Sequence, residues 1–155
     1  MSLQELQVLL QSISSFAIAG GLIYAAVQFR HARRAAHVAN FTRMVELQMH
    51  LREMRVHDPV LAQVYKHDVA QLADARAIRE YFFNLMQLSV YEIVWFSHRM
   101  GQIPADYYRS WEKRVRDIAQ EESFRNMLRN PSMKIMHDDF QRYIERLVGD
   151  LEARR

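Results

Sequence analysis

Between Leu6 and Phe29 the chain has 24 consecutive residues without a charged side chain. A helix of about 20 residues crosses the roughly 30 Å hydrocarbon core of a bilayer, so the run is long enough to span one. Its centre, Phe16–Val27, is apolar apart from the hydroxyl of Tyr24. Serine hydroxyls elsewhere in the run can bond to carbonyl groups of the preceding turn. The run therefore predicts one uncleaved transmembrane helix within residues 1–29.

The charges that flank this run predict its orientation. Only the N-terminal amine and Glu5 precede it, whereas Arg30, Arg33 and Arg34 follow it. Positive residues next to a membrane helix stay on the cytoplasmic side. We therefore expect the N-terminus outside and the C-terminus in the cytoplasm. The three arginines are also candidate membrane-interface residues, because anionic lipid headgroups attract each of them by about 1 kcal/mol.

Two other interpretations of the apolar run remain open. A cleaved signal peptide would begin with positive charge, and here the charge asymmetry is reversed, although Ala17-Ile-Ala19 has the small-x-small pattern of a cleavage site. Alternatively, the run is the first helix of a soluble bundle, buried among the others, since its glutamines and serines moderate its hydropathy.

Small residues recur along one side of the predicted span. Ala17, Gly21 and Ala25 are four positions apart, which places them on one stripe of a helix. Such a stripe lets a second helix approach closely. It predicts a homo-oligomer or a docked membrane-protein partner, while the simpler explanation is that small residues are common in membrane helices.

The composition favours an all-α fold, because the whole chain has only 4 glycines and 3 prolines. Neither residue occurs between Leu22 and Asp58, so the membrane helix is expected to continue unbroken through a juxtamembrane extension, residues 30–57. Within this extension an apolar stripe is expected to pack against another element, and it consists of Met44, Leu47, Leu51 and Met54.

Residues 58–155 are predicted to form a cytoplasmic helical bundle. Asp58-Pro59 is typical of a helix start, and Gly101 of a helix end. The most apolar helix is expected at the centre of the bundle. The expected helices are 59–67, the central helix 75–100, 105–121, a short turn around 124–128, and 133–151.

No residue set predicts catalysis, a metal site or a cofactor. Glu46, His50, Glu53 and His57 would suit zinc or iron by ligand type, but they lie opposite the apolar stripe and are expected to be a solvated face. There is no cysteine and no HExxH, Glu-x-x-His or Gly-rich phosphate motif. Acidic and basic residues are intermixed, with a net charge of +3, so we expect no nucleic-acid partner.

Glu92 is the one ionisable residue that the pattern places in a buried position. It lies between Tyr91 and Ile93 in the apolar helix, and a buried carboxylate must be paired or neutral. It is either a proton or ligand site, a structural partner of an arginine, tryptophan or tyrosine, or a residue at the bundle edge. Another cluster, His137-Asp138-Asp139, is expected to stabilise a helix start through the helix dipole.

Several of these features together resemble an uncharacterised family of short bacterial single-pass membrane proteins with a small helical cytoplasmic domain. They are the uncharged span before Arg30–Arg34, the aromatic Phe82–Trp95 helix closed by Gly101-Gln-Ile103, Trp111, and Phe124-Arg125. The resemblance implies this architecture and a location in the bacterial inner membrane. It implies no catalytic residues.

The leading hypothesis is a non-enzymatic membrane-anchored protein that binds membrane lipid and associates with itself or with a membrane-protein partner. The alternative is a subunit of an oligomeric channel or transport assembly, in which Gly20, Gly21, Ser12, Ser14 and Ser15 would line an interface or pore. A soluble helical enzyme or metal protein is a further alternative.

Overall fold

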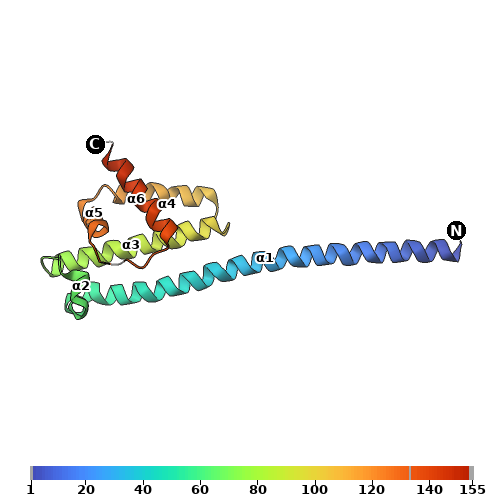
Figure 1. Cartoon of the computed structure of the whole chain (residues 1–155), viewed down its shortest axis with the longest axis horizontal. Helices are drawn as coiled ribbons and strands as arrows, with labels where there is room; N and C mark the ends of the chain where they lie inside the picture. Colours follow the sequence, from blue (N-terminus) through green and yellow to red (C-terminus); the bar gives the residue numbers. More distant parts are fainter. Residues whose placement is uncertain (1, 133, 154–155) are drawn as a thin grey trace. The chain divides into compact units, whose positions relative to one another are not determined.

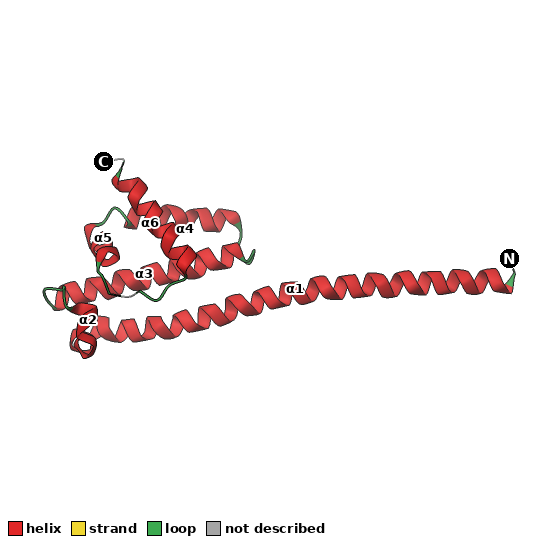
Figure 2. Ribbon diagram, viewed as in Figure 1, coloured by secondary structure: helices red, strands yellow, loops and turns green. Residues whose placement is uncertain are grey.

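The computed structural model describes residues 2–132 and 134–153, and it is 85% helical with no strand among them (Figure 1 and Figure 2). This confirms the predicted all-α fold with a long N-terminal helix. The chain divides into two units, residues 1–37 and 38–155. Helix α1 (Leu3–His57) contributes to both. The sequence predicts boundaries after residue 29, where the membrane span should end, and after residue 57, where the juxtamembrane extension should end. Contacts within the chain do not test these two boundaries, and they stay predictions.

The first unit is the N-terminal part of α1. Ser2 and Glu5 cap its start reciprocally, with the Ser2 N–H donating to Glu5 Oε2 at 2.8 Å and the Glu5 N–H to Ser2 Oγ at 3.3 Å. Ser12 and Ser15 each donate to the carbonyl four residues earlier, both at 2.9 Å, which confirms the expected bonding within the helix. Among the described residues, α1 contains an 18-residue stretch with a mean hydropathy of 1.6, and the helix is long and apolar enough to cross a membrane. None of this stretch (0%) is buried.

The second unit is built around α3 (Ala75–Arg99), as predicted for the most apolar helix. Residues 38–57 of α1 lie on one side of it (Figure 1). The other side is covered by α4 (Ala105–Ile118), α5 (Glu122–Arg129) and α6 (Asp138–Glu152). The most deeply buried side chains of its core are at most 2% exposed and include Phe82, Leu88, Tyr91, Phe124, Met127, Phe140 and Ile144.

Polar caps and one glycine set the ends of the central elements. Asp58 accepts from the Val60 N–H at 3.0 Å and begins η1 (Pro59–Tyr65), which leads into α2 (Lys66–Val69). Asp74 caps α3 by accepting from the Ala77 N–H at 2.8 Å. Gly101 follows the end of α3 with φ +71°, a conformation that favours glycine. The predicted start at Asp58 and end at Gly101 are thus confirmed.

The expectation that the stripe of Met44, Leu47, Leu51 and Met54 packs is wrong. These four side chains are 44–65% exposed. The face that meets α3 is rotated by one position and contains Val45 and Arg52, which are 4% and 7% exposed. Phe41, on the same face, contacts the ring of Phe96 with 4.5 Å between centroids. The polar Arg52 is tolerated there because α3 supplies hydrogen-bond acceptors for it.

The last helix begins at Asp138, later than predicted. Residues 134–137 are not helical, and the predicted first residue, Met133, lies outside the described residues. Side-chain bonds hold this segment out of the helix. Lys134 Nζ donates to the Asn130 carbonyl at 2.6 Å, and the His137 N–H donates to Glu92. The first turn of α6 contains Asp138 and Asp139, as expected for carboxylates at a helix start.

Candidate functional site

The predicted membrane-interface and helix-packing residues all lie in the first unit and are exposed. They are Arg30, Arg33 and Arg34, and the stripe of Ala17, Gly21 and Ala25. A Cβ atom built on Gly21 would meet no heavy atom within 4 Å. The small size of this residue therefore has no explanation within the described part of the chain.

The predicted buried carboxylate, Glu92, lies in the middle of α3 and is 2% exposed. Its Oε1 accepts a hydrogen bond from the backbone N–H of His137 at 2.5 Å. Burial raises its pKa, and this effect is opposed by the His137 hydrogen bond and by the charges of His137 and Arg52. The structure thus pairs Glu92 with a backbone donor, a partner that the sequence reasoning did not name.

A buried guanidinium, Arg52, lies on the α1 side of the same helix. Its Nη1 donates to Ser89 Oγ and to the Leu85 carbonyl, the latter at 3.5 Å, and its Nη2 donates to Gln48 Oε1 at 3.3 Å. All three acceptors are neutral. Burial lowers the pKa of Arg52, and the nearby charge of Glu92 opposes this. Sequence reasoning missed this residue, although its spacing from Gln48 and Val45 places it on one helix face.

A cavity of about 410 Å³ opens beside Arg52 in the second unit. Arg55 lies over the Phe82 ring, 5.0 Å from its centroid, and pairs with Asp68 at 3.6 Å. The complete lining, which we call the arginine cavity, comprises Gln48, Leu51, Arg52, Arg55, His67, Asp68, Tyr81, Phe82, Leu85, Ser132 and Ile135.

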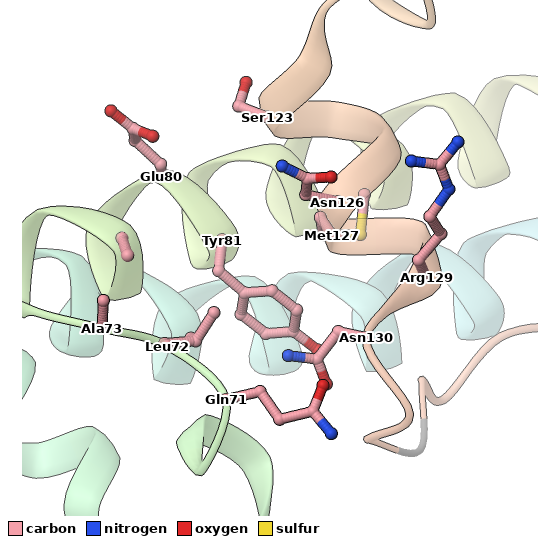
Figure 3. Close-up of a pocket in the computed structure, with 11 residues that line it drawn as sticks. Gln71, Leu72, Ala73, Glu80, Tyr81, Ser123, Asn126, Met127, Arg129 and Asn130 are labelled. Carbon is pink, nitrogen blue, oxygen red and sulfur yellow. The ribbon is translucent and has the colours of Figure 1, made fainter.

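A second cavity, also about 410 Å³, shares Tyr81 with the arginine cavity, and Figure 3 shows the residues that line it. Amide side chains of Gln71, Asn126 and Asn130 line it, and Figure 3 shows those of Gln71 and Asn130 near the Tyr81 ring. The Tyr81 hydroxyl is 2.6 Å from Ser132 Oγ. The lining also contains one acidic and one basic side chain, Glu80 and Arg129, so its formal charges are of both signs.

Three tyrosines form a hydrogen-bonded cluster between α3, α4 and α6. The Tyr91 hydroxyl is 3.0 Å from that of Tyr143 and 3.5 Å from that of Tyr108, and Tyr143 donates to Glu112 Oε1 at 3.0 Å. Burial raises the pKa of Tyr91 and of Tyr143, so both stay neutral donors at ordinary pH. The cluster satisfies buried hydroxyls and ties the three helices together.

These arrangements offer binding surfaces rather than an activated nucleophile. Ser89 Oγ donates to the Leu85 carbonyl at 3.0 Å and accepts from Arg52, so no base takes its proton. Among the described residues, no three histidine, aspartate or glutamate side chains gather as a metal-binding group. The four residues expected to form a solvated face are exposed, and they are Glu46, His50, Glu53 and His57.

Comparison of the chain with family models, with curated proteins and with solved structures found no match.

Proposed function

We propose that the chain is a non-enzymatic, single-pass protein of the bacterial inner membrane whose helical domain associates with a second copy or with a membrane-protein partner. In this proposal residues 6–29 span the bilayer and residues 38–155 lie on the cytoplasmic side. Membrane lipid is then a partner through Arg30, Arg33 and Arg34.

The observation that carries the proposal is the exposure of the apolar window in α1. A core helix of a soluble protein hides such a window, whereas 0% of this one is buried. Exposing so much apolar surface to water is unfavourable, by roughly 25 cal/mol per Å². Hydrocarbon removes that penalty, and the adjoining arginines suit the headgroup region.

The association part of the proposal has separate support in the second unit. The stripe of Met44, Leu47, Leu51 and Met54 stays 44–65% exposed although it is apolar and helical. A contiguous apolar patch on a folded surface is typical of an interaction site. For the alternative of a channel subunit, the hydroxyls of Ser12 and Ser15 donate to carbonyls of their own helix, and no observation specifically favours a pore.

Membrane extraction combined with protease accessibility tests the anchor and its orientation. The full chain, tagged at the C-terminus, is expressed in bacteria and the membranes are washed with alkaline carbonate. We expect the chain to remain in the pellet, with the tag protected in spheroplasts and digested after lysis. Release by carbonate would contradict the anchor, and digestion in intact spheroplasts would contradict the orientation.

A charge-reversal variant serves as the control for orientation. Replacing Arg30, Arg33 and Arg34 together by glutamate removes the positive charge that holds this end inside. We expect the tag of a substantial share of these molecules to become accessible in spheroplasts, while carbonate resistance persists. Unchanged protection would mean that other features set the topology.

A further inference from the structure

We propose that the arginine cavity binds a small anionic amphiphile, a carboxylate or phosphate group carrying a short apolar body, with the anionic group at Arg52. The proposal concerns only the second unit. It therefore does not depend on whether the N-terminal helix crosses a membrane.

The first step is the charge of Arg52, which is not hydrogen-bonded to a carboxylate among the described residues. Its side chain is 7% exposed, and its hydrogen-bond partners Ser89, Leu85 and Gln48 are all neutral. Buried guanidinium groups are normally matched by a carboxylate or phosphate, whose geometry fits their donors. Glu92 attracts Arg52 electrostatically, but its carboxylate is bonded to His137 and does not line the cavity.

The second step is the charge of the lining as a whole. Arg55 Nη1 and Asp68 Oδ2 are 3.6 Å apart, so the opposite charges of these two side chains largely offset each other. His67 Nε2 also lies 3.2 Å from Asp68 Oδ1. Among the arginine and aspartate side chains of the lining, two arginines and one aspartate give a formal charge of +1. An anionic group on a ligand would offset this positive charge.

The third step is the apolar part of the cavity. Phe82 and Leu85 are 2% and 5% exposed and form its buried wall, while Leu51 and Ile135 are 59% and 61% exposed at its margin. A volume of about 410 Å³ lies within the range of small-molecule sites. An anion with an apolar body would satisfy Arg52 and cover these side chains at once.

Calorimetry on the full chain in phosphatidylcholine nanodiscs tests the proposal. The probes are phenyl phosphate, 4-phenylbutyrate, its neutral amide and inorganic phosphate, with empty nanodiscs to correct for partitioning. We expect at least one aryl anion to bind about tenfold or more tighter than both the amide and inorganic phosphate. Whichever of phenyl phosphate and 4-phenylbutyrate binds with the higher affinity shows whether the site prefers a phosphate or a carboxylate group. The proposal is overturned if neither aryl anion binds more tightly than both the amide and inorganic phosphate.

Two variants at the exposed margin keep this test independent of folding. Ile135→Glu adds a negative charge beside the cavity and should weaken the bound aryl anion about fivefold, whereas Ile135→Lys should strengthen it by a similar factor. Lys113→Glu changes an exposed charge on α4, away from the lining, and should leave affinity unchanged. Arg52→Met should abolish binding while the helical circular dichroism persists. Indistinguishable Ile135 variants, or an equal effect of Lys113→Glu, would overturn the assignment.

Discussion

The carboxylate of Glu92 accepts the backbone N–H of His137 at 2.5 Å, joining the middle of α3 to the residue that precedes α6. The two residues are 45 positions apart. Because the carboxylate is 2% exposed, water cannot replace this bond without opening the core. The contact therefore fixes where the last helix begins, and Arg52 supplies the opposite charge from the α1 side.

Removing the Glu92 side chain should destabilise the second unit. We expect Glu92→Ala to lower the free energy of unfolding by about 3 kcal/mol, because the part-buried N–H of His137 loses its acceptor and Arg52 loses a nearby negative charge. Glu92→Gln keeps an acceptor oxygen and should cost about 1 kcal/mol. Urea unfolding of the full chain in micelles, followed by tryptophan fluorescence, measures this, since Trp95 and Trp111 both lie in the second unit. Equal losses in the two variants would contradict the role of the acceptor.

The raised pKa of Glu92 predicts how stability depends on pH. Its folded pKa lies above the ordinary value of about 4.5, so the folded state keeps this proton to higher pH than the unfolded state does. The resulting stabilisation is complete below the unfolded pKa and is lost as pH rises through the folded pKa. Wild type should therefore lose stability relative to Glu92→Gln as pH rises from about 4.5. Unfolding free energies of both proteins across a pH series measure the difference, and a constant difference would contradict the shift.

Local sequence pattern was sufficient for the central part of the fold. The 75–99 segment is the most apolar of the second unit and therefore lies at its centre, and Asp58 and Gly101 act through their own backbone surroundings. The packing face of residues 38–57 could not be predicted in this way. Both the Met44 stripe and the Val45 face present apolar residues, and the choice depends on Leu85 and Ser89, which are 33 and 37 positions from Arg52.

The candidate site was predictable only in part for the same reason. Glu92 stands out because a charge interrupts an apolar helix. The partner of Glu92 does not stand out in the sequence, because the donor is the backbone N–H of His137. Every residue except proline has such an N–H group. Arg52 resembles an ordinary surface residue of a charged helix until the position of α3 is known.

Substitutions in the exposed stripe of Met44, Leu47, Leu51 and Met54 should affect association without affecting the stability of the fold. We expect Leu47→Lys, at a side chain 58% exposed, to change the free energy of unfolding by less than about 0.5 kcal/mol while weakening association. The neighbouring Val45→Lys, at a side chain 4% exposed, should destabilise by about 3 kcal/mol or more, because a charge enters the core without a partner. Urea unfolding and light scattering in micelles measure the two effects. A strongly destabilised Leu47→Lys would place the stripe in the core after all.

The membrane-segment stripe allows a similar test with adjacent glycines. A Cβ at either Gly20 or Gly21 meets no atom within 4 Å apart from the neighbouring backbone of its own helix, so neither Gly20→Leu nor Gly21→Leu should disturb the monomer. Only Gly21 shares a stripe with Ala17 and Ala25, where a leucine would keep a second helix away. We expect Gly21→Leu to lower the association constant in bilayers by about tenfold, or about 1.4 kcal/mol, and Gly20→Leu to leave it nearly unchanged. Energy transfer between labelled chains in vesicles measures this, and equal effects of the two substitutions would exclude the stripe as the contact.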